Sequence, residues 1–141
     1  MATSQTHVEL LGKVPLFQGL SEDELEVLLR STSETDFQAG TDVVREGDKG
    51  AGFHLILSGT ATVTKGGQTL RSLGPGESFG DIALIDDGHR TATVHADAPL
   101  HTLSITTWNF KPVLLEHPQI AYKLLVELCR RLREAEARAA I

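Results

Sequence analysis

The chain has 141 residues, of which 40% are hydrophobic and 23% charged, a composition that is typical of one soluble globular domain with a single core. The net charge of −6 arises within residues 1–50, so no basic stripe is available to neutralise the phosphates of DNA or RNA. The one cysteine, Cys129, excludes an internal disulfide and a four-cysteine metal site.

The N-terminal segment, residues 1–34, is predicted to be helical. Ser21 and Glu24 have the spacing of a capping box, in which the serine caps the first turn and the glutamate reaches back to the serine N–H. Leucines at helical spacing follow, at Leu25, Leu28 and Leu29. These signals predict a helix that begins next to Ser21.

The middle of the chain, residues 35–106, has the pattern of many short strands, because glycine-rich turn signals recur every several residues. Residues 60–64 and 91–95 alternate polar and apolar side chains, so each is expected to turn one face toward a core. Gly66-Gly67 fits a tight hairpin turn between two strands. The pattern predicts a sandwich or a barrel.

The last segment, residues 107–141, returns to helix, with a break at His117-Pro118 and no glycine or proline from residue 119 to residue 140. Two apolar stripes run along the long helix. One consists of Ile120, Leu124 and Leu128, and the other of Tyr122, Leu125, Cys129 and Leu132. One stripe is expected to cover the β-structure and the other to pair with a second chain, unless both are buried within one subunit. Four arginines near the end alternate with glutamates, which indicates a solvated helix face.

Residues 80–94 carry the clearest functional signal. Gly80 and Ala83 leave backbone N–H groups unobstructed, and Arg90 places one cation beside the small pair Thr91-Ala92. A phosphate needs such donors, since it carries several acceptor oxygens and a negative charge. Asp81 adds an acceptor for a sugar hydroxyl, so the set indicates a phosphorylated sugar and hence a nucleotide.

This segment resembles the phosphate-binding cassette of cyclic-nucleotide-binding domains, the sensor module of catabolite-activator-type regulators and of cyclic-nucleotide-dependent kinases and channels. The cassette occurs here within residues 79–94, as Phe79-Gly80-Asp81-Ile82-Ala83-Leu84 and then Arg90-Thr91-Ala92-Thr93-Val94. A second signature of the family lies upstream, as Gly47-Asp48 followed by Phe53, Leu55, Ile56, Gly59 and Val63. The resemblance spans roughly residues 14–132.

The resemblance implies a mainly β fold with flanking helices. The expected architecture is an eight-stranded, jelly-roll-like β-roll, also called a double-stranded β-helix, with N-terminal helices and a long C-terminal helix. All 141 residues would form one cyclic-nucleotide-binding domain. Its parts would be N-terminal helices at 1–34, the β-roll at 35–106 and C-terminal helices at 107–141.

The resemblance also implies a ligand, cyclic AMP or cyclic GMP, bound by the arginine and by backbone N–H groups of the cassette. The predicted ligand-binding residues are Gly80, Asp81, Ile82, Ala83, Arg90, Thr91 and Ala92. Asp81 departs from the family pattern, which has a glutamate bonded to the ribose 2′-hydroxyl, and its side chain is shorter by about 1.5 Å. The remaining interpretation of Asp81 is a turn residue that caps local N–H groups.

The identity of the base depends on two further positions. A threonine at the position of Thr91 can bond the 2-amino group of guanine, which favours cyclic GMP by resemblance. The hydroxyl pair that recognises adenine in catabolite-activator-type proteins falls at Ala135-Glu136, where neither residue has a hydroxyl. Capping of the base would then fall to Leu128, Arg131, Leu132 or Ala135.

Several other classes of function lack their sequence signals. The six histidines show no metal-site spacing, and no nucleophile elbow occurs, so we expect no enzyme activity, catalytic residue, metal or cofactor. A cupin-like metalloenzyme is the remaining alternative of that class. Residues 1–14 lack the pattern of a secretory signal, and no apolar run approaches the ~20 residues of a membrane span. The sequence therefore predicts a cytoplasmic protein without membrane or direct nucleic-acid binding.

The combined prediction is a stand-alone sensor, since no helix-turn-helix, kinase, channel or acyltransferase sequence follows Ile141. By resemblance, ligand capture tightens the cassette and repositions the C-terminal helix, which signals to an effector protein or within a homodimer. The alternative is a domain that kept the fold, lost the ligand and serves as a protein-interaction or dimerisation module. Asp81 and Ala135-Glu136 are the features that favour this alternative.

Overall fold

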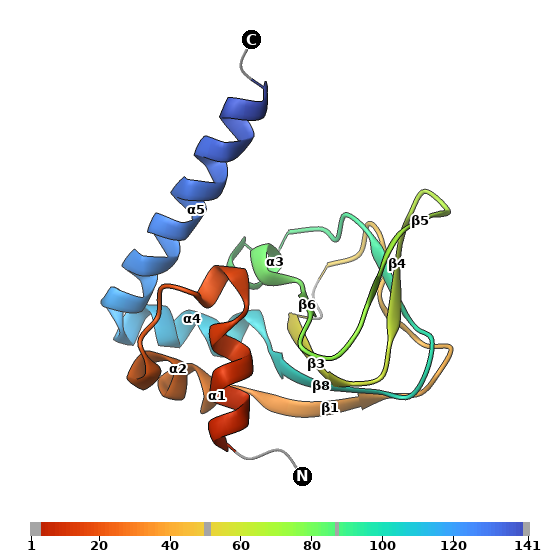
Figure 1. Cartoon of the computed structure of the whole chain (residues 1–141), viewed down its shortest axis with the longest axis horizontal. Coiled ribbons are helices and arrows are strands. Elements are labelled where there is room, and N and C mark those ends of the chain that lie inside the picture. Colours follow the sequence, from red (N-terminus) through yellow and green to blue (C-terminus); the bar gives the residue numbers. More distant parts are fainter. Residues whose placement is uncertain (1–3, 50–51, 87, 140–141) are drawn as a thin grey trace. The chain divides into compact units, whose positions relative to one another are not determined.

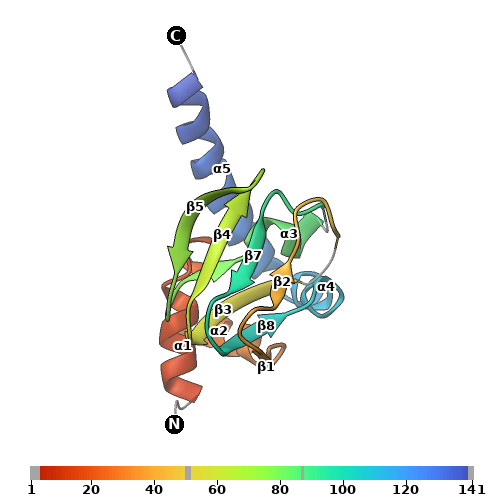
Figure 2. The same cartoon turned by 90° about the vertical axis from the view of Figure 1, so that its right-hand side faces the viewer.

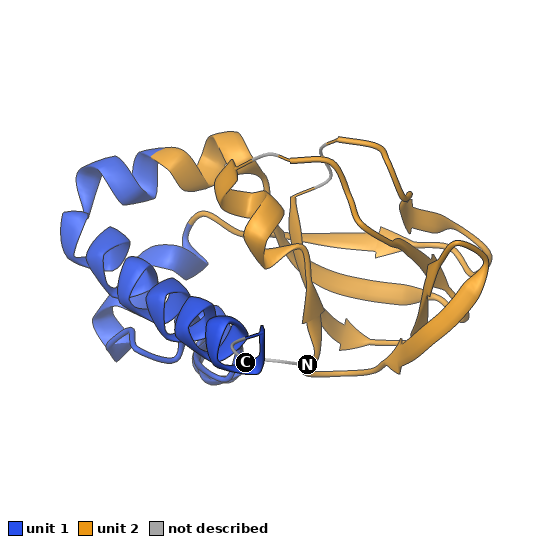
Figure 3. Ribbon diagram, turned by 90° about the horizontal axis from the view of Figure 1, so that it is seen from above, with its two compact units in different colours: residues 1–30, 112–141 blue, residues 31–111 orange. Residues whose placement is uncertain are grey.

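A computed structural model of the chain describes residues 4–49, 52–86 and 88–139. The chain divides into two compact units, one formed by residues 1–30 and 112–141 and the other by residues 31–111 (Figure 3). The second unit holds the strands and the first is helical. The molecule is thus mainly antiparallel β-structure with flanking helices, as the sequence predicts.

The β unit contains eight strands within the described residues (Figure 1). They are β1 (Ser33–Phe37), β2 (Asp42–Val44), β3 (Phe53–Ser58), β4 (Ala61–Lys65), β5 (Gln68–Leu73), β6 (Ser78–Phe79), β7 (Thr93–Ala96) and β8 (Leu100–Ile105). Two four-stranded sheets result, in the orders β1-β8-β3-β6 and β2-β7-β4-β5. Figure 2 shows the second sheet, with β7 between β2 and β4. The predicted β-roll is confirmed.

The core of the β unit is filled from both sheets. The alternation predicted for residues 60–64 is observed in β4, where Ala61 and Val63 are buried. They belong to a buried cluster that consists of Val44, Ile56, Ala61, Val63, Leu73, Val94, Ala96 and Leu100. Burial of these aliphatic side chains stabilises the sheet pair, at ~25 cal/mol for each Å² of apolar surface removed from water.

The hairpin turn between β4 and β5 lies where the glycine pair predicts it. Gly66 has φ +58° and Gly67 has φ +80°, and these left-handed values suit the two central residues of a tight hairpin turn. A side chain at either position would strain the backbone. The turn sets the pairing of β4 with β5, from Lys65 opposite Gln68 to Ala61 opposite Leu73.

The helical elements are α1 (Ser4–Gly12), the 3-10 helix η1 (Pro15–Phe17), α2 (Glu22–Leu29), α3 (Asp81–Asp86), α4 (Thr107–Glu116) and α5 (Pro118–Ala139). α3 belongs to the β unit, and α4 begins there and ends in the helical unit. None of the described helices has the length and hydropathy that a membrane span requires.

The capping box at the start of α2 forms as its spacing predicts. The Glu24 N–H donates to Ser21 Oγ at 3.2 Å, and the Ser21 N–H donates to Glu24 Oε1 at 2.8 Å. The same Glu24 oxygen also accepts from Lys123 Nζ of α5 at 2.6 Å. One carboxylate therefore closes the N-terminus of α2 and joins it to the long helix.

The two apolar stripes of α5 differ in burial. Ile120 and Leu124, from the first stripe, are 1% and 3% exposed. From the second stripe, Tyr122 and Leu125 are 68% and 59% exposed, and Leu132 and Cys129 are exposed as well. The interpretation in which one subunit buries both stripes is therefore wrong for this chain. α5 ends at Ala139, and the last two residues of the predicted helical segment, 140 and 141, lie outside the described residues.

Candidate functional site

The backbone of Arg90 is held by the upstream sequence signature. Its N–H donates to the carbonyl oxygen of Asp48, and its own carbonyl accepts from the N–H of Gly47, both at 2.8 Å. Gly47 has φ +88°, which lets the chain turn at this point. The Gly47-Asp48 signature and the cassette arginine, which lie more than forty residues apart, thus pair with each other in the structure.

The Arg90 side chain is enclosed rather than displayed on the surface. The residue is only 8% exposed, and one terminal guanidinium nitrogen donates to the carbonyl oxygen of Gly52. A Cβ built on Gly80 would lie 2.5 Å from the other terminal nitrogen of Arg90. Gly80, at φ +89°, is therefore needed both for its backbone conformation and for this close approach. A solvent-exposed ion pair, the ordinary role of such an arginine, does not describe Arg90.

The small turn predicted at residues 80–83 is the start of the short helix α3. The carbonyl of Gly80 accepts from the N–H of Leu84 at 3.0 Å, and Leu84 is fully buried. Asp81 Oδ1 accepts from the N–H of Ile82 at 2.8 Å. The carboxylate therefore occupies one of the backbone donors that the sequence predicts for the ligand. Ile82 is 45% exposed, so its side chain contributes little to the core.

Thr91 and Ala92 follow Arg90 directly and differ in environment. Thr91 is exposed, whereas Ala92 is half-buried and packs against the core of the β unit. Next along the chain, Thr93 Oγ1 accepts from the N–H of Glu46 at 2.9 Å. The cassette is thus anchored on both sides of its small pair, by Arg90 before it and by Thr93 after it.

The first residue of the cassette packs against a group of rings centred on the buried His54. The ring of His54 stacks on Phe79, the residue before Gly80, with centroids 5.1 Å apart and an interplanar angle of 23°. His54 Nδ1 lies 3.1 Å from the hydroxyl oxygen of Thr102. Phe37 contacts the same imidazole edge-on at 5.5 Å. This packing fixes the strand that leads into the cassette.

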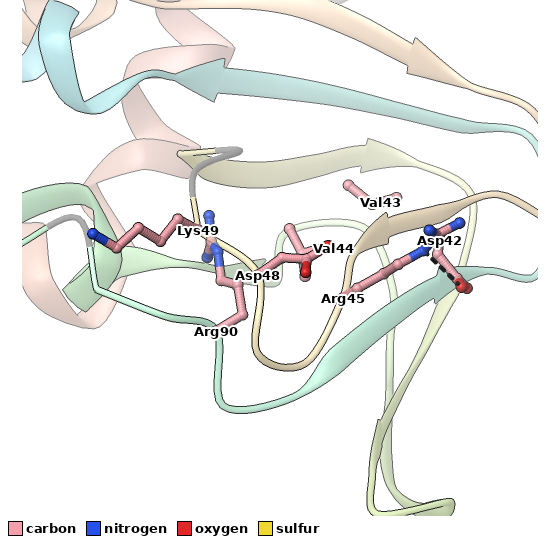
Figure 4. A pocket seen from close by; sticks show the side chains of 7 residues that line it. All are labelled: Asp42, Val43, Val44, Arg45, Asp48, Lys49 and Arg90. Carbon is pink, nitrogen blue, oxygen red and sulfur yellow. Dashed lines mark ion pairs between the residues drawn. The ribbon is translucent and has the colours of Figure 1, made fainter.

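A cavity of about 230 Å³ lies beside Arg90 (Figure 4). Its lining consists of Asp42, Val43, Val44, Arg45, Asp48, Lys49 and Arg90. The sequence did not predict that β2 and the turn after it line a cavity beside Arg90. The signal for them was the Gly47-Asp48 motif, which marks a turn but does not reveal which strand lies next to it.

The cavity is cationic on balance, with three basic and two acidic side chains in its lining. Arg45 Nε lies 3.5 Å from Asp42 Oδ2, and the other Asp42 oxygen is 2.8 Å from His95 Nδ1. The hydrogen bond with His95 holds the pKa of the Asp42 carboxyl below its usual value. Asp42 thus stays ionised and holds Arg45 at the edge of the cavity.

Two further predictions concern groups elsewhere in the chain. The residues expected to cap a base all lie on α5, where Leu128 and Arg131 are half-buried and Leu132 and Ala135 are exposed.

Within residues 4–49, 52–86 and 88–139, no group of three or more histidine, cysteine, aspartate or glutamate side chains could hold a metal ion.

The chain is similar to known cyclic-nucleotide-binding proteins. A family model described as the cyclic nucleotide-binding domain matches residues 34–117. The cyclic AMP receptor protein of Thermus thermophilus is 34% identical over 127 residues, which cover 86% of this chain and 59% of that protein. The cAMP-dependent protein kinase regulatory subunit of Yarrowia lipolytica is 35% identical over 101 residues, which cover 72% of this chain and 27% of the subunit.

A solved structure resembles the chain over almost its whole length. The N-terminal domain of a transcriptional regulator from Streptomyces coelicolor A3(2) superposes with a TM-score of 0.86 at 28% identity, and the match covers 94% of this chain and 96% of that domain. In contrast, the chain spans no more than 59% of the length of the two curated relatives.

Proposed function

This chain belongs to the cyclic nucleotide-binding domain family, and we propose that it binds a purine cyclic monophosphate, cyclic AMP or cyclic GMP, as a regulatory sensor and not as an enzyme. Its similarity to a cyclic AMP receptor protein and to a kinase regulatory subunit supports a regulatory role. The ligand-binding residues that we propose are Gly80, Asp81, Ile82, Ala83, Arg90, Thr91 and Ala92.

The observation that carries this proposal is the position of the Arg90 guanidinium. It is enclosed between the carbonyl of Gly52 and the bare Cα of Gly80, the second residue of the cassette. An arginine keeps its charge when buried and can bond two phosphate oxygens at once. A buried cation next to the backbone N–H groups of residues 80–83 matches the single charge and several acceptor oxygens of a cyclic phosphate, once Asp81 releases the N–H of Ile82.

The role proposed for Asp81 requires a change of partner. Its carboxylate now accepts from the N–H of Ile82. If a phosphate oxygen takes that N–H, the carboxylate is released toward the ribose 2′-hydroxyl, either directly or through a water molecule. Loss of a hydrogen bond to a charged group would cost ~1.5–3 kcal/mol, which is roughly ten- to a hundredfold in affinity.

We further propose that ligand binding is signalled through α5 to a partner protein or a second copy of the chain. The exposed stripe that contains Tyr122, Leu125 and Leu132 supports this step, because it leaves apolar surface on one helix face. Cys129 lies in the same stripe, is exposed and is the one cysteine of the chain. A dimer with parallel α5 helices would bring two copies of Cys129 together, so formation of a disulfide-linked dimer in mild oxidant tests this arrangement.

A second candidate function is a protein-interaction module that has kept the fold without the ligand. The bond from the Ile82 N–H to Asp81 favours it, since a turn aspartate that caps its own helix needs no sugar partner. Under this alternative, the exposed stripe of α5 would be the functional surface and Arg90 would have a structural role, to which its bond to the Gly52 carbonyl contributes.

A thermal-unfolding screen separates the two candidates. A ligand that binds only the folded state raises the melting temperature, by an amount that grows with the ratio of its concentration to its Kd. We expect cyclic AMP or cyclic GMP at millimolar concentration to raise the melting temperature, and 5′-AMP, which has an open dianionic phosphate, to raise it less. Equal melting temperatures with and without both cyclic nucleotides would favour the ligand-free module.

A further inference from the structure

We propose that the hydroxyl of Thr107 transmits occupancy of the cassette to the start of α4. The hydroxyl donates a hydrogen bond to the carbonyl oxygen of Ala83 in α3, over a distance of 3.3 Å. This inference rests on the proposed nucleotide binding and adds to it a positioning residue, one that acts through α3 and touches no ligand.

The N–H groups and the carbonyl groups of α3 have different partners. Its first N–H groups, at residues 81–83, are the proposed donors to the ligand. The carbonyl groups of a helix point the opposite way along its axis. The carbonyl of Ala83 accepts from Thr107, so this one residue carries both a proposed N–H donor to the phosphate and the acceptor of the bond to α4. A change in the position of α3 would therefore move the acceptor of the Thr107 bond.

The start of α4 is held together by its own cap and by a buried side chain. Thr106 caps it, because its hydroxyl accepts from the Asn109 N–H at 3.2 Å and its carbonyl accepts from the Phe110 N–H at 3.0 Å. Phe110 is 1% exposed and anchors the first turn. From there α4 continues to Glu116, and α5 begins two residues later, at Pro118.

The Thr107 hydroxyl is not needed to form the helix, because Thr106 already supplies the cap. Thr107→Val keeps the β-branched shape and the size of the side chain and removes only the donor to Ala83. Thr107→Ser keeps the donor and removes a methyl group. These two variants separate the hydrogen bond from the packing at the same position.

Hydrogen exchange of the full chain, with and without saturating cyclic AMP or cyclic GMP, tests this inference. In the wild type we expect the nucleotide to slow exchange in residues 80–92, which reports binding, and in residues 107–114, which reports transmission. Thr107→Val should keep the slowing in residues 80–92 and lose most of it in residues 107–114. Thr107→Ser should behave as the wild type does. Nucleotide affinity should change by less than about tenfold in either variant, as expected for one neutral hydrogen bond.

The possible outcomes distinguish this inference from the proposed function. If neither nucleotide slows exchange anywhere in the wild type, the proposed function fails and the inference fails with it. If residues 80–92 are protected but Thr107→Val protects α4 as strongly as the wild type does, the function stands and the inference is overturned. Equal loss of α4 protection in Thr107→Val and Thr107→Ser would also overturn it, since packing would then be the cause.

Discussion

The cassette around Arg90 and the long helix around Arg130 place an arginine in opposite environments. Arg90 is 8% exposed, and its guanidinium bonds a backbone carbonyl beside two glycines. Arg130 is exposed and forms ion pairs with Glu127 and Glu134, one turn before and after it on α5. The hydrogen bond from Arg130 lowers the pKa of the Glu127 carboxyl, so that pair persists at neutral pH.

The comparison shows how the arginine proposed to bind the ligand differs from a surface one. Carboxylates already satisfy Arg130, which fits the solvated helix face that the sequence predicts, and an added anion would have to displace them. Arg90 is buried and donates to the carbonyl oxygen of Gly52, and under the proposed function a phosphate bound beside its guanidinium would gain charge–charge energy. Burial strengthens that gain, because the local dielectric constant is lower than in water.

The largest expected effect concerns the two glycines Gly80 and Gly40, which share one backbone conformation. Their φ angles are +89° and +88°, but a Cβ on Gly40 meets no atom within 4 Å, whereas one on Gly80 meets Gly52 and Arg90. Alanine at either site should cost about 1–2 kcal/mol of folding free energy for the left-handed backbone, and Gly80→Ala should cost more than Gly40→Ala because its Cβ also meets the carbonyl oxygen of Gly52. We expect only Gly80→Ala to weaken nucleotide binding, by at least about a hundredfold, because it displaces the Arg90 guanidinium.

Calorimetric titration and urea unfolding of both variants measure these two quantities. Gly40→Ala is the matched control for backbone strain. Equal affinities in Gly80→Ala and Gly40→Ala would show that the close approach of Gly80 to Arg90 has no part in binding.

A gain in affinity is expected from Asp81→Glu. The added methylene lengthens the reach by about 1.5 Å and restores the residue that the family has at this position. If the aspartate falls short of the ribose hydroxyl, the variant should bind ten- to a hundredfold more tightly, as expected for a charge-assisted hydrogen bond. Binding of 2′-deoxy cyclic AMP, which lacks that hydroxyl, should not improve. An equal gain for both nucleotides would contradict a ribose role.

A smaller effect is expected at Glu24, in the helical unit. Glu24→Gln keeps a capping-box side chain and removes the charge that pairs with Lys123, whereas Glu24→Ala removes both. Because the lysine is 39% exposed at its side chain, the ion pair should contribute no more than about 1 kcal/mol. Urea unfolding should therefore rank the wild type above Glu24→Gln and Glu24→Ala lowest. If Glu24→Gln were less stable than Glu24→Ala, the effect of Glu24 could not be the sum of a capping contribution and an ion-pair contribution.

The same carboxylate gives the helical unit a pH dependence. The hydrogen bond from Lys123 is the main cause that lowers the pKa of Glu24 below its ordinary value of 4.5. A lowered folded-state pKa means that the stabilisation is complete above pH 4.5 and is lost as the pH falls through the folded-state pKa. When the pH is lowered from 7 through the folded-state pKa of Glu24, urea unfolding should show a larger loss of unfolding free energy in the wild type than in Glu24→Gln.

The smallest expected effect is a second pH dependence of stability, opposite in sign to that of Glu24, which arises from His101 in the β unit. His101 bonds Asp36 with one ring nitrogen and Glu34 with the other, at 2.7 Å for Glu34, and the bond with Asp36 is the main cause that raises its pKa above 6.5. Its stabilisation is complete below pH 6.5 and is lost as the pH rises through the raised value. Unfolding free energy should fall by less than about 1 kcal/mol across that range, and His101→Gln should abolish the fall.

The elements that the sequence predicts are those whose cause is local. Ser21 and Glu24 lie three residues apart, and Gly66-Gly67 form a turn with their own φ angles, so their structures need no distant partner. Arg90 was identified because a family pattern carries it. Its contact with Gly52 and the cavity lined by β2 depend on the pairing of β2 with β7, about fifty residues away, which a single sequence does not reveal.

The contact between Thr107 and Ala83 also depends on segments that are distant in the sequence. Neither residue belongs to a motif that links them, and the hydrogen bond exists only because α3 and α4 are brought together by the strands between them. Exposure of the second apolar stripe of α5 was likewise undetermined, since helical spacing shows that a face is apolar but not what covers it.

Calorimetric titration of cyclic AMP and cyclic GMP into the wild type and Arg90→Gln tests the central claim most directly. Arg71→Gln, which removes an exposed arginine from β5 of the same unit, is the control. We expect at least one nucleotide to bind the wild type and Arg71→Gln with equal affinity, and Arg90→Gln to bind it at least about a hundredfold more weakly. Wild-type affinity in a folded Arg90→Gln protein would contradict the account.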